Sequence, residues 1–248
     1  MRPLVRPLLL VPAFNAEATV GDVVRDLARV LPGVPVLVVD DGSMDTTARR
    51  AREAGATWVI THPTNRGKGA ALQTGLGEAE QRGFDAVVTV DADGQHPAES
   101  ARVLVDVSCG RSLVLGVRDL ERDGAPRANR FSNGFSNRAL GLFSGKRLAD
   151  TQCGLRRYPT AEALALGARA SGFAFEAEVL LRAIAAGVPI VEVPVRVVYP
   201  TGRRSHFHVV RDPARIVAVV LLTVWELRGF RRRDSNPDKR IQSPLSYR

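Results

Sequence analysis

The sequence is poor in cysteine, in aromatic residues and in long apolar runs, and each shortage excludes a class of protein. Its 248 residues contain two cysteines, Cys109 and Cys153, which are too few and too far apart for a disulfide framework or a zinc knuckle. We expect two reduced thiols in a cytosolic protein. Aromatic side chains make up 6% of the residues, which disfavours stacking on nucleic-acid bases. No run of about 18 apolar residues occurs, so we expect no simple membrane-spanning helix.

The composition does show a strong positive charge and an ordinary apolar content. Thirty-five Lys and Arg residues against 26 Asp and Glu residues give a formal net charge of +9. Such a charge attracts nucleic acid, anionic lipid or phosphorylated small molecules. The apolar share of 45% is that of a folded globular protein. The length is sufficient for one large α/β domain or two small ones.

Short apolar runs alternate with helical patterns through the first half of the chain. Because this alternation is typical of βαβ units, we expect a mainly parallel, Rossmann-like sheet flanked by helices. The expected strands are residues 8–11, 36–39, 58–61, 86–90 and 113–117, and the expected helices are residues 18–31, 46–54, 70–82 and 97–107. Asp45 is the expected N-cap of the second helix, and Gly55 is expected to end it.

The second half of the chain is less regular. Residues 127–143 and 175–186 are expected to be helical, and residues 189–198 to form a strand that Pro194 confines to an edge or a bulge. Residues 212–230 predict a long helix that is apolar on almost all sides. This helix either packs in the core or lies on an anionic membrane surface. In the second case the arginines that follow it would bind the anionic lipid headgroups.

The segments that directly follow the expected strands carry the chemistry. Ligands of parallel α/β sheets bind at the carboxyl ends of the strands, so we expect these segments to converge on one rim. They are residues 12–17, 40–43, 65–69, 91–95 and 118–119. Four of the five contain an acidic residue, and this coincidence is the main physical evidence for a site.

The acidic run Asp91-Ala92-Asp93 comes directly after an apolar strand. Mg²⁺ and Mn²⁺ prefer oxygen ligands and usually keep water and substrate phosphates in their shell. A lone pair of this kind is often a solvated turn, but Asp40 and Asp41 match it after another strand. The pattern favours a metal site in which one of the two carboxylates binds the cation, while the other faces a ribose or supports the ion from farther away.

The segment Asn65-Arg66-Gly67-Lys68-Gly69 suggests a phosphate-binding loop. It is not a Walker A motif, because Gly69 follows Lys68 where that motif has Ser or Thr. The segment is either a flexible turn before the next helix or a glycine-hinged loop that brings Arg66 or Lys68 to a nucleotide. The neighbouring loops favour the second interpretation.

Four motifs in this order resemble those of the family 2 glycosyltransferases, and more narrowly the dolichyl- or polyprenyl-phosphate mannosyl- and glucosyltransferase branch. They are Val11-Pro12-Ala13-Phe14-Asn15, Val38-Val39-Asp40-Asp41-Gly42-Ser43, Asn65-Arg66-Gly67-Lys68-Gly69 and Asp91-Ala92-Asp93-Gly94-Gln95-His96-Pro97. The resemblance implies a GT-A fold, a GDP-mannose or UDP-glucose donor, Mg²⁺ or Mn²⁺, and inversion at the anomeric carbon. It also implies a polyprenyl phosphate acceptor.

The resemblance extends over about residues 8–230 and implies one domain at residues 1–230. Its donor half would span about residues 8–118, and the acceptor half, about residues 119–230, would include an acceptor-side extension and a C-terminal helix. The polar composition of residues 231–248 predicts a disordered basic tail.

The resemblance, together with the motifs, assigns roles to individual residues. It implies that Asp93 holds the metal and that Asp91 lies close to the ion, near the ribose and diphosphate. The expected nucleotide-sugar-binding residues are Pro12, Phe14, Glu17, Asp41, Lys68, Asp91, Ala92, Gln95, Arg118 and Arg203. The expected acceptor-phosphate residues are Arg127, Arg130 and Arg156, and the expected catalytic residues are Asp93, Asp150, Arg118 and Arg130. Asp150 could be a base, a group that positions the sugar, or an organiser of Arg156. An alcohol acceptor would need a base, whereas a phosphate acceptor is already an anion.

The expected location is the cytoplasmic face of a membrane, reached by peripheral attachment or through a membrane-embedded partner. No nucleic-acid partner is expected. One alternative is a glycosyltransferase with a non-lipid acceptor. Another is a sugar nucleotidyltransferase, which normally has a glycine-rich loop with a basic residue where this chain has Pro12-Ala13-Phe14-Asn15. A nucleotide-sugar-binding module without activity is a third.

Overall fold

The computed structural model describes residues 6–199, apart from 109, 126 and 173, together with residues 218–227. Arg203, Cys109 and the expected tail at residues 231–248 lie outside the described residues. So do the two ends of the helix that was expected at residues 212–230.

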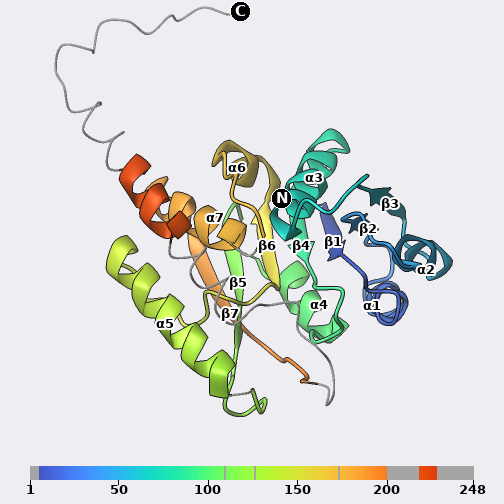
Figure 1. Ribbon diagram of the computed structural model, residues 1–248, viewed down its shortest axis with the longest axis horizontal. Coiled ribbons are helices and arrows are strands. Elements are labelled where there is room, and N and C mark those ends of the chain that lie inside the picture. Colours follow the sequence, from blue (N-terminus) through green and yellow to red (C-terminus); the bar gives the residue numbers. More distant parts are fainter. Residues whose placement is uncertain (1–5, 109, 126, 173, 200–217, 228–248) are drawn as a thin grey trace, which may run out of the picture.

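A seven-stranded sheet forms the centre of the protein, with the strand order β3-β2-β1-β4-β6-β5-β7 (Figure 1). The strands are β1 (Pro7–Ala13), β2 (Val36–Asp40), β3 (Trp58–Thr61), β4 (Ala86–Thr89), β5 (Leu113–Arg118), β6 (Arg156–Pro159) and β7 (Ile190–Val195). All neighbouring pairs are parallel except those of β6, which is antiparallel to both β4 and β5. The expected mainly parallel α/β sheet is therefore confirmed.

Helices cover both faces of this sheet and bury its apolar side chains in two cores. They are α1 (Val20–Val30), α2 (Thr47–Glu53), α3 (Lys68–Gln81), α4 (Ala98–Asp106), α5 (Arg127–Ser144), α6 (Thr160–Ala165) and α7 (Ala174–Ala185). Because side chains alternate along a strand, Leu8 and Leu10 of β1 enter the core under α3, α6 and α7. Leu9 and Val11 enter the core under α1 and α4.

The elements expected in the first half are present, with small shifts at their ends. Two local expectations are wrong. The N-cap of α2 is Thr46 and not Asp45, although the Asp45 carboxylate accepts a hydrogen bond from the Thr47 amide at 2.9 Å. Helix α3 begins at Lys68, so Lys68 belongs to the first helical turn and not to a loop.

Strand β6 and helix α6 were not predicted. The strand is short and contains Arg156 and Arg157, so its sequence shows neither an apolar run nor polar–apolar alternation. Nevertheless it is fully buried between β4 and β5. The expectation for Pro194 is confirmed, because it lies in β7 at the outer edge of the sheet, where a missing amide donor is tolerated.

Residues 218–227 form a helix with two different sides. Val220 and Thr223 are buried, whereas Leu222 and Trp225 are exposed. The Arg182 side chain of α7 holds this helix through an ion pair of 2.7 Å with Glu226. The described part thus packs on the core and also presents an apolar outer side. None of the helices within the described ranges is long and apolar enough to cross a membrane.

Candidate active site

The segments that follow β1 to β5 lie at one rim of the sheet, as expected. Strands β1 to β4 are parallel, and β5 has the same direction because β6 is antiparallel to both of its neighbours. The carboxyl ends of all five strands therefore point to the same edge.

Asp41, at the end of β2, organises the turn that leads into α3. Its buried carboxylate accepts hydrogen bonds from the backbone amides of Arg66 at 3.0 Å and Gly67 at 2.6 Å. The imidazole Nδ1 of His62 lies 2.7 Å from the same carboxylate. Gly67 has a φ of 89°, which favours glycine. These contacts give Asp41 a positioning function for the turn, in addition to the nucleotide-sugar contact that is expected of it. His62 was not predicted.

The β1–α1 turn packs against the β2–α2 turn through Glu17. The exposed Glu17 carboxylate accepts hydrogen bonds from the Thr46 amide at 3.1 Å and the Thr46 hydroxyl at 2.8 Å, and these bonds lower the pKa of Glu17. Pro12 is buried within β1, and Phe14 beside it is half-buried. The structure therefore brings these three predicted donor-site residues to the same end of β1.

Lys68 is held between two carboxylates that come from distant parts of the chain. Its ammonium lies 2.7 Å from Asp91 after β4 and 3.3 Å from Glu176 in α7. Burial alone would lower the pKa of Lys68, but the two carboxylates outweigh burial and raise it above its usual range. Burial would conversely raise the pKa of Asp91, and Lys68 lowers it instead. Asp91 is thus an anion paired with a lysine, and Glu176 is a site residue that the sequence did not predict.

Gly154 leaves the space in which this ion pair forms. A Cβ atom at position 154 would collide with the Asp91 carboxylate, and it would lie 2.9 Å from the Lys68 ammonium. The segment before β6 can therefore approach the acidic run only because residue 154 has no side chain.

Asp93 is the exposed carboxylate of the acidic run. Its Oδ1 accepts a hydrogen bond from the Gln95 amide at 2.9 Å, while the buried Ala92 accepts one through its carbonyl from Thr19 at 2.6 Å. Among the described residues no group of three or more His, Cys, Asp and Glu side chains is arranged to hold a metal. An exposed carboxylate still fits Mg²⁺ or Mn²⁺, because these ions complete their shell with water and substrate phosphates.

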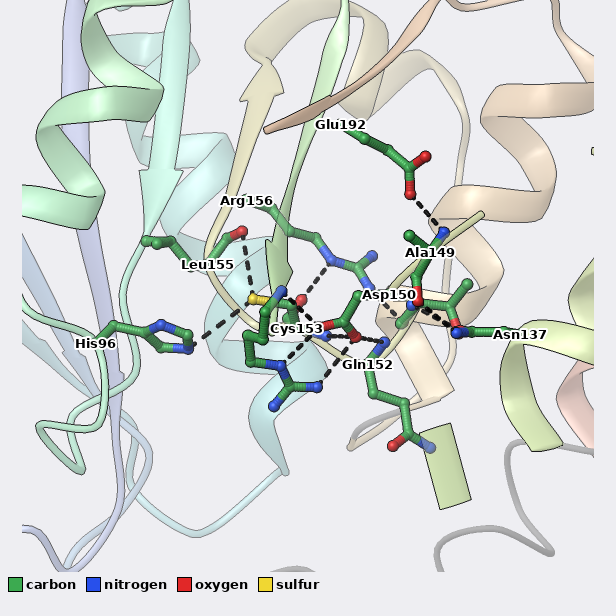
Figure 2. A network of polar contacts seen from close by, with 11 residues as sticks. His96, Asn137, Ala149, Asp150, Gln152, Cys153, Leu155, Arg156 and Glu192 are labelled. Carbon is green, nitrogen blue, oxygen red and sulfur yellow. Dashed lines mark hydrogen bonds and ion pairs between the residues drawn. The ribbon is translucent and has the colours of Figure 1, made fainter. Parts of the chain in front are cut away.

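Arg118, at the end of β5, forms a bidentate ion pair with Asp150 (Figure 2 shows the surrounding network). The Arg118 guanidinium donates from Nε at 2.6 Å and from Nη2 at 3.0 Å. The Asp150 carboxylate, whose side chain is 0% exposed, also accepts from the backbone amides of Gln152 and Cys153 at 3.1 Å each. Burial would lower the pKa of Arg118, but Asp150 raises it, so the cation is permanent.

The contacts of Asp150 decide among the three functions that the sequence left open. Both oxygens are buried and accept several hydrogen bonds, which leaves no geometry for a base that reaches a substrate proton. Asp150 organises Arg118, and not Arg156 as one alternative suggested.

Arg156 does not fit the predicted contact with an acceptor phosphate. Its side chain is completely buried, and its guanidinium donates to the carbonyl oxygens of Thr151 at 2.7 Å, Glu176 at 2.8 Å and Cys153 at 2.9 Å. A buried arginine must satisfy its donors within the chain. Arg156 therefore ties the segment before β6 to the first turn of α7.

His96 and Cys153 form a buried neutral pair between the acidic run and Arg118. The Cys153 sulfur lies 4.0 Å from His96 Nε2 (Figure 2). Burial lowers the pKa of His96 to about 4, and burial together with Asp150 raises the pKa of Cys153 to about 12. Neither group is charged near neutral pH, so the pair is not a thiolate–imidazolium nucleophile.

The remaining predicted arginines lie on α5. Arg127 and Arg130 are exposed, and Arg130 Nη1 lies 3.9 Å from Glu121. Their exposure leaves them open to an anion.

Comparison with known proteins adds evidence of a different kind. The family model described as "Glycosyl transferase family 2" matches residues 9–160, which is more than half of the chain. The polyprenol monophosphomannose synthase of Mycolicibacterium smegmatis is 32% identical over 212 residues, covering 79% of this chain and 78% of that protein. The dolichyl-phosphate hexose transferase of Haloferax volcanii is 30% identical over 184 residues, covering 73% of this chain and 78% of that protein.

A solved structure also resembles this fold. Glucosyl-3-phosphoglycerate synthase from Mycobacterium tuberculosis, in complex with Mn²⁺, uridine diphosphate and phosphoglyceric acid, has a TM-score of 0.67. It is 21% identical, and the superposition covers 89% of this chain and 78% of that one. At this level of identity the likeness concerns the fold.

Proposed function

The chain belongs to glycosyl transferase family 2 and has the GT-A fold, and we propose that it transfers a hexose from GDP-mannose or UDP-glucose to a polyprenyl or dolichyl phosphate. Transfer would invert the anomeric carbon. The names of the relatives described above, each with a lipid phosphate in its activity, support this acceptor class.

The burial of Asp150 is the observation that best supports a phosphate acceptor. An alcohol acceptor must lose a proton during attack and needs a general base. Asp150, the carboxylate that the sequence offers as a possible base, has both oxygens buried and hydrogen-bonded. A phosphate monoester is already an anion near neutral pH, so it can attack the sugar carbon without a base.

The residues of the rim would act mainly by holding charge in place. The leaving group is a nucleoside diphosphate, on which negative charge grows as the bond to the sugar breaks. Arg118 and Lys68 are permanent cations at this rim, and each is oriented by a carboxylate. Oriented charges of this kind stabilise a transition state without reorganisation at the moment of reaction. Pro12 and Phe14, at the end of β1, would line the pocket of the nucleobase.

Asp93, with Asp91 behind it, would hold Mg²⁺ or Mn²⁺. The ion would act as a Lewis acid on the leaving diphosphate. Asp93 supplies the outward carboxylate, whereas Lys68 restrains Asp91. The manganese and uridine diphosphate in the similar solved structure support this proposal.

The acceptor phosphate would bind at Arg127 and Arg130, with its lipid chain in a membrane surface. Phe131 and Leu142 on α5 are 80% and 84% exposed, and Trp225 in the helix at residues 218–227 is 74% exposed. Exposed apolar side chains beside arginines are typical of helices that lie on anionic membranes. We therefore place the protein at the cytoplasmic membrane face, attached peripherally.

The experiment that tests the function uses the full chain with Mg²⁺ or Mn²⁺. GDP-mannose, UDP-glucose and other nucleotide-sugars are supplied with polyprenyl phosphate, with 3-phosphoglycerate, or with no acceptor. We expect transfer of one sugar to the lipid only. Turnover onto 3-phosphoglycerate, protein or polysaccharide without lipid would contradict the acceptor.

The metal site has its own test. Asp93→Ala should abolish metal-dependent binding of the nucleotide-sugar, measured by calorimetry with and without Mn²⁺. Glu53→Ala is the matched control, because Glu53 is an exposed carboxylate of α2 that pairs with Arg49 on the surface. Unchanged metal-dependent binding in Asp93→Ala would show that Asp93 is not the metal ligand.

A further inference from the structure

Asn137 of α5 connects the acceptor side of the site to Arg118. Its side-chain amide donates to the Ala149 carbonyl at 2.6 Å. Its oxygen accepts hydrogen bonds from the Thr151 amide at 2.9 Å and the Thr151 hydroxyl at 2.7 Å. One side chain therefore holds the residues on both sides of Asp150 (Figure 2).

This bracket acts on Asp150, whose position decides where Arg118 points. The Asp150 carboxylate receives two guanidinium donors of Arg118, at 2.6 Å and 3.0 Å. A bidentate arginine–carboxylate pair fixes orientation as well as distance. A shift of residues 149–151 would therefore move the guanidinium of Arg118.

Other contacts hold the same segment, but they do not bracket Asp150. Gln152 donates from its side chain to the Ser136 hydroxyl at 2.9 Å, and the Ala149 amide donates to Glu192 at 2.7 Å. Each of these bonds touches one side of Asp150 only. An asparagine suits the position of Asn137 because its amide both donates to a carbonyl and accepts from an amide.

Helix α5 carries Asn137 and the exposed Arg130 on the same face. The two residues are two helical turns apart, and side chains at this spacing project in nearly the same direction. A stiff helix thus sets the distance between Arg130 and the segment that holds Arg118.

We infer that Asn137 is a positioning residue that keeps the Arg118 guanidinium at a fixed distance and orientation relative to the acceptor-binding face of α5. The inference rests on the proposed function in one respect, namely that Arg130 meets the acceptor phosphate and Arg118 the donor. It assigns to Asn137 no contact with substrate. Loss of Asn137 should therefore impair turnover more than binding.

The first test observes Arg118 directly and needs no substrate. In the full chain, the Arg118 Nε–H signal is identified by its loss in Arg118→Lys, and its exchange with solvent is followed by NMR. Asn137→Ala should speed this exchange about tenfold, because local opening of the segment frees the guanidinium. The matched control is Ser136→Ala, which removes one bond to the same segment and should leave the exchange within about twofold of the wild type.

The second test measures kinetics with the nucleotide-sugar and polyprenyl phosphate. Asn137→Ala should lower kcat about tenfold or more, because small misplacements of catalytic groups are costly, with both KM values within about threefold. If wild-type protein transfers no sugar to the lipid, the proposed function fails, while the exchange measurement still decides the role of Asn137.

Two outcomes would overturn the inference. One is an unchanged Arg118 exchange rate in Asn137→Ala, and the other is an equal acceleration in Ser136→Ala, which would indicate general loosening. Should Asn137→Ala fail to fold, Asn137→Asp decides, because it keeps the oxygen that accepts from Thr151 and loses the donor to the Ala149 carbonyl, which opens the bracket on one side. Unchanged exchange in a folded Asn137→Asp would then refute the inference.

Discussion

At the scale of single residues, most charges of the site are satisfied inside the chain. Lys68 lies against Asp91 and Glu176, Arg118 against Asp150, and Arg156 against three carbonyl oxygens. A buried charge is tolerated only when it is paired and hydrogen-bonded. Lys68 and Arg118 are therefore rim cations whose positions are determined before any ligand arrives.

Asp150 provides the first prediction at this scale. Asp150→Asn removes the charge that compensates Arg118, and breaking a buried ion pair in this way costs about 3 kcal/mol of unfolding free energy. Urea denaturation measures the change. The control Asp22→Asn affects a surface pair and should cost less than about 1 kcal/mol. Equal stability of the two variants would show that the Arg118–Asp150 pair does not contribute as described.

His96 predicts a pH dependence of stability. Its pKa in the folded protein is about 4, against about 6.5 in an unfolded chain. Between these values the unfolded state binds more protons, so stability falls as the pH falls from about 6.5 to 4. The loss due to His96 is about 3 kcal/mol at pH 4.

The measurement compares urea denaturation of the wild type and His96→Asn across this range. The wild type should show the steeper loss of stability toward acid pH. Parallel curves would mean that His96 is not buried in its neutral form.

At the scale of elements, the close packing of a helix on the sheet determines which glycine positions can accept a side chain. In α3, a Cβ atom on Gly75 would overlap the Leu10 side chain of β1, whereas a Cβ atom on Gly77 would meet no atom within 4 Å. The first glycine permits α3 to pack on β1, and the second is not required for packing.

These two glycines give a matched pair of substitutions within one helix. Gly75→Ala should lower the unfolding free energy by about 1–3 kcal/mol, because overpacking displaces Leu10. Gly77→Ala should raise it by up to about 1 kcal/mol, because alanine favours a helix interior. Denaturation midpoints test both signs. A stabilising Gly75→Ala would contradict the close packing of α3 on β1.

At the scale of the whole molecule, apolar side chains remain exposed on two helices that both contact α7. Helix α5 packs against α7, and the helix at residues 218–227 is joined to it by the Arg182–Glu226 ion pair. The apolar surface of these two helices comprises Phe131 and Leu142 on α5 and Leu221, Leu222 and Trp225 on the helix at residues 218–227. Exposed apolar surface bordered by charge marks an interaction site, in agreement with the membrane attachment proposed above.

This surface predicts binding to anionic lipid. The double substitution of Leu222→Ser and Trp225→Ser should weaken co-sedimentation with phosphatidylglycerol vesicles about tenfold or more, because two apolar side chains no longer enter the bilayer. Higher salt should weaken binding of the wild type as well. Met44→Ser is the control, because Met44 is 96% exposed outside this surface. Equal binding of the control and the double variant would contradict membrane docking through residues 218–227.

Periodicity and local turn chemistry determined much of the fold from the sequence alone. The apolar runs of β1 to β5, the helical patterns between them and Pro194 at an edge all depend on neighbouring residues, so a sequence shows them directly. Parallel strands with acids at their ends then predicted the rim and its acidic run at Asp91 and Asp93.

Only the tertiary structure decided the partners of the buried charges. Strand β6 has no apolar pattern, yet the sheet accepts it because the guanidinium of Arg156 reaches carbonyl oxygens of residues 151, 153 and 176. Lys68 pairs with Glu176 across 108 positions of sequence. Asp150, in the segment between α5 and β6, meets Arg118 at the end of β5. Such partners are brought together by the packing of distant elements, and no local spacing in the sequence encodes which of them will meet.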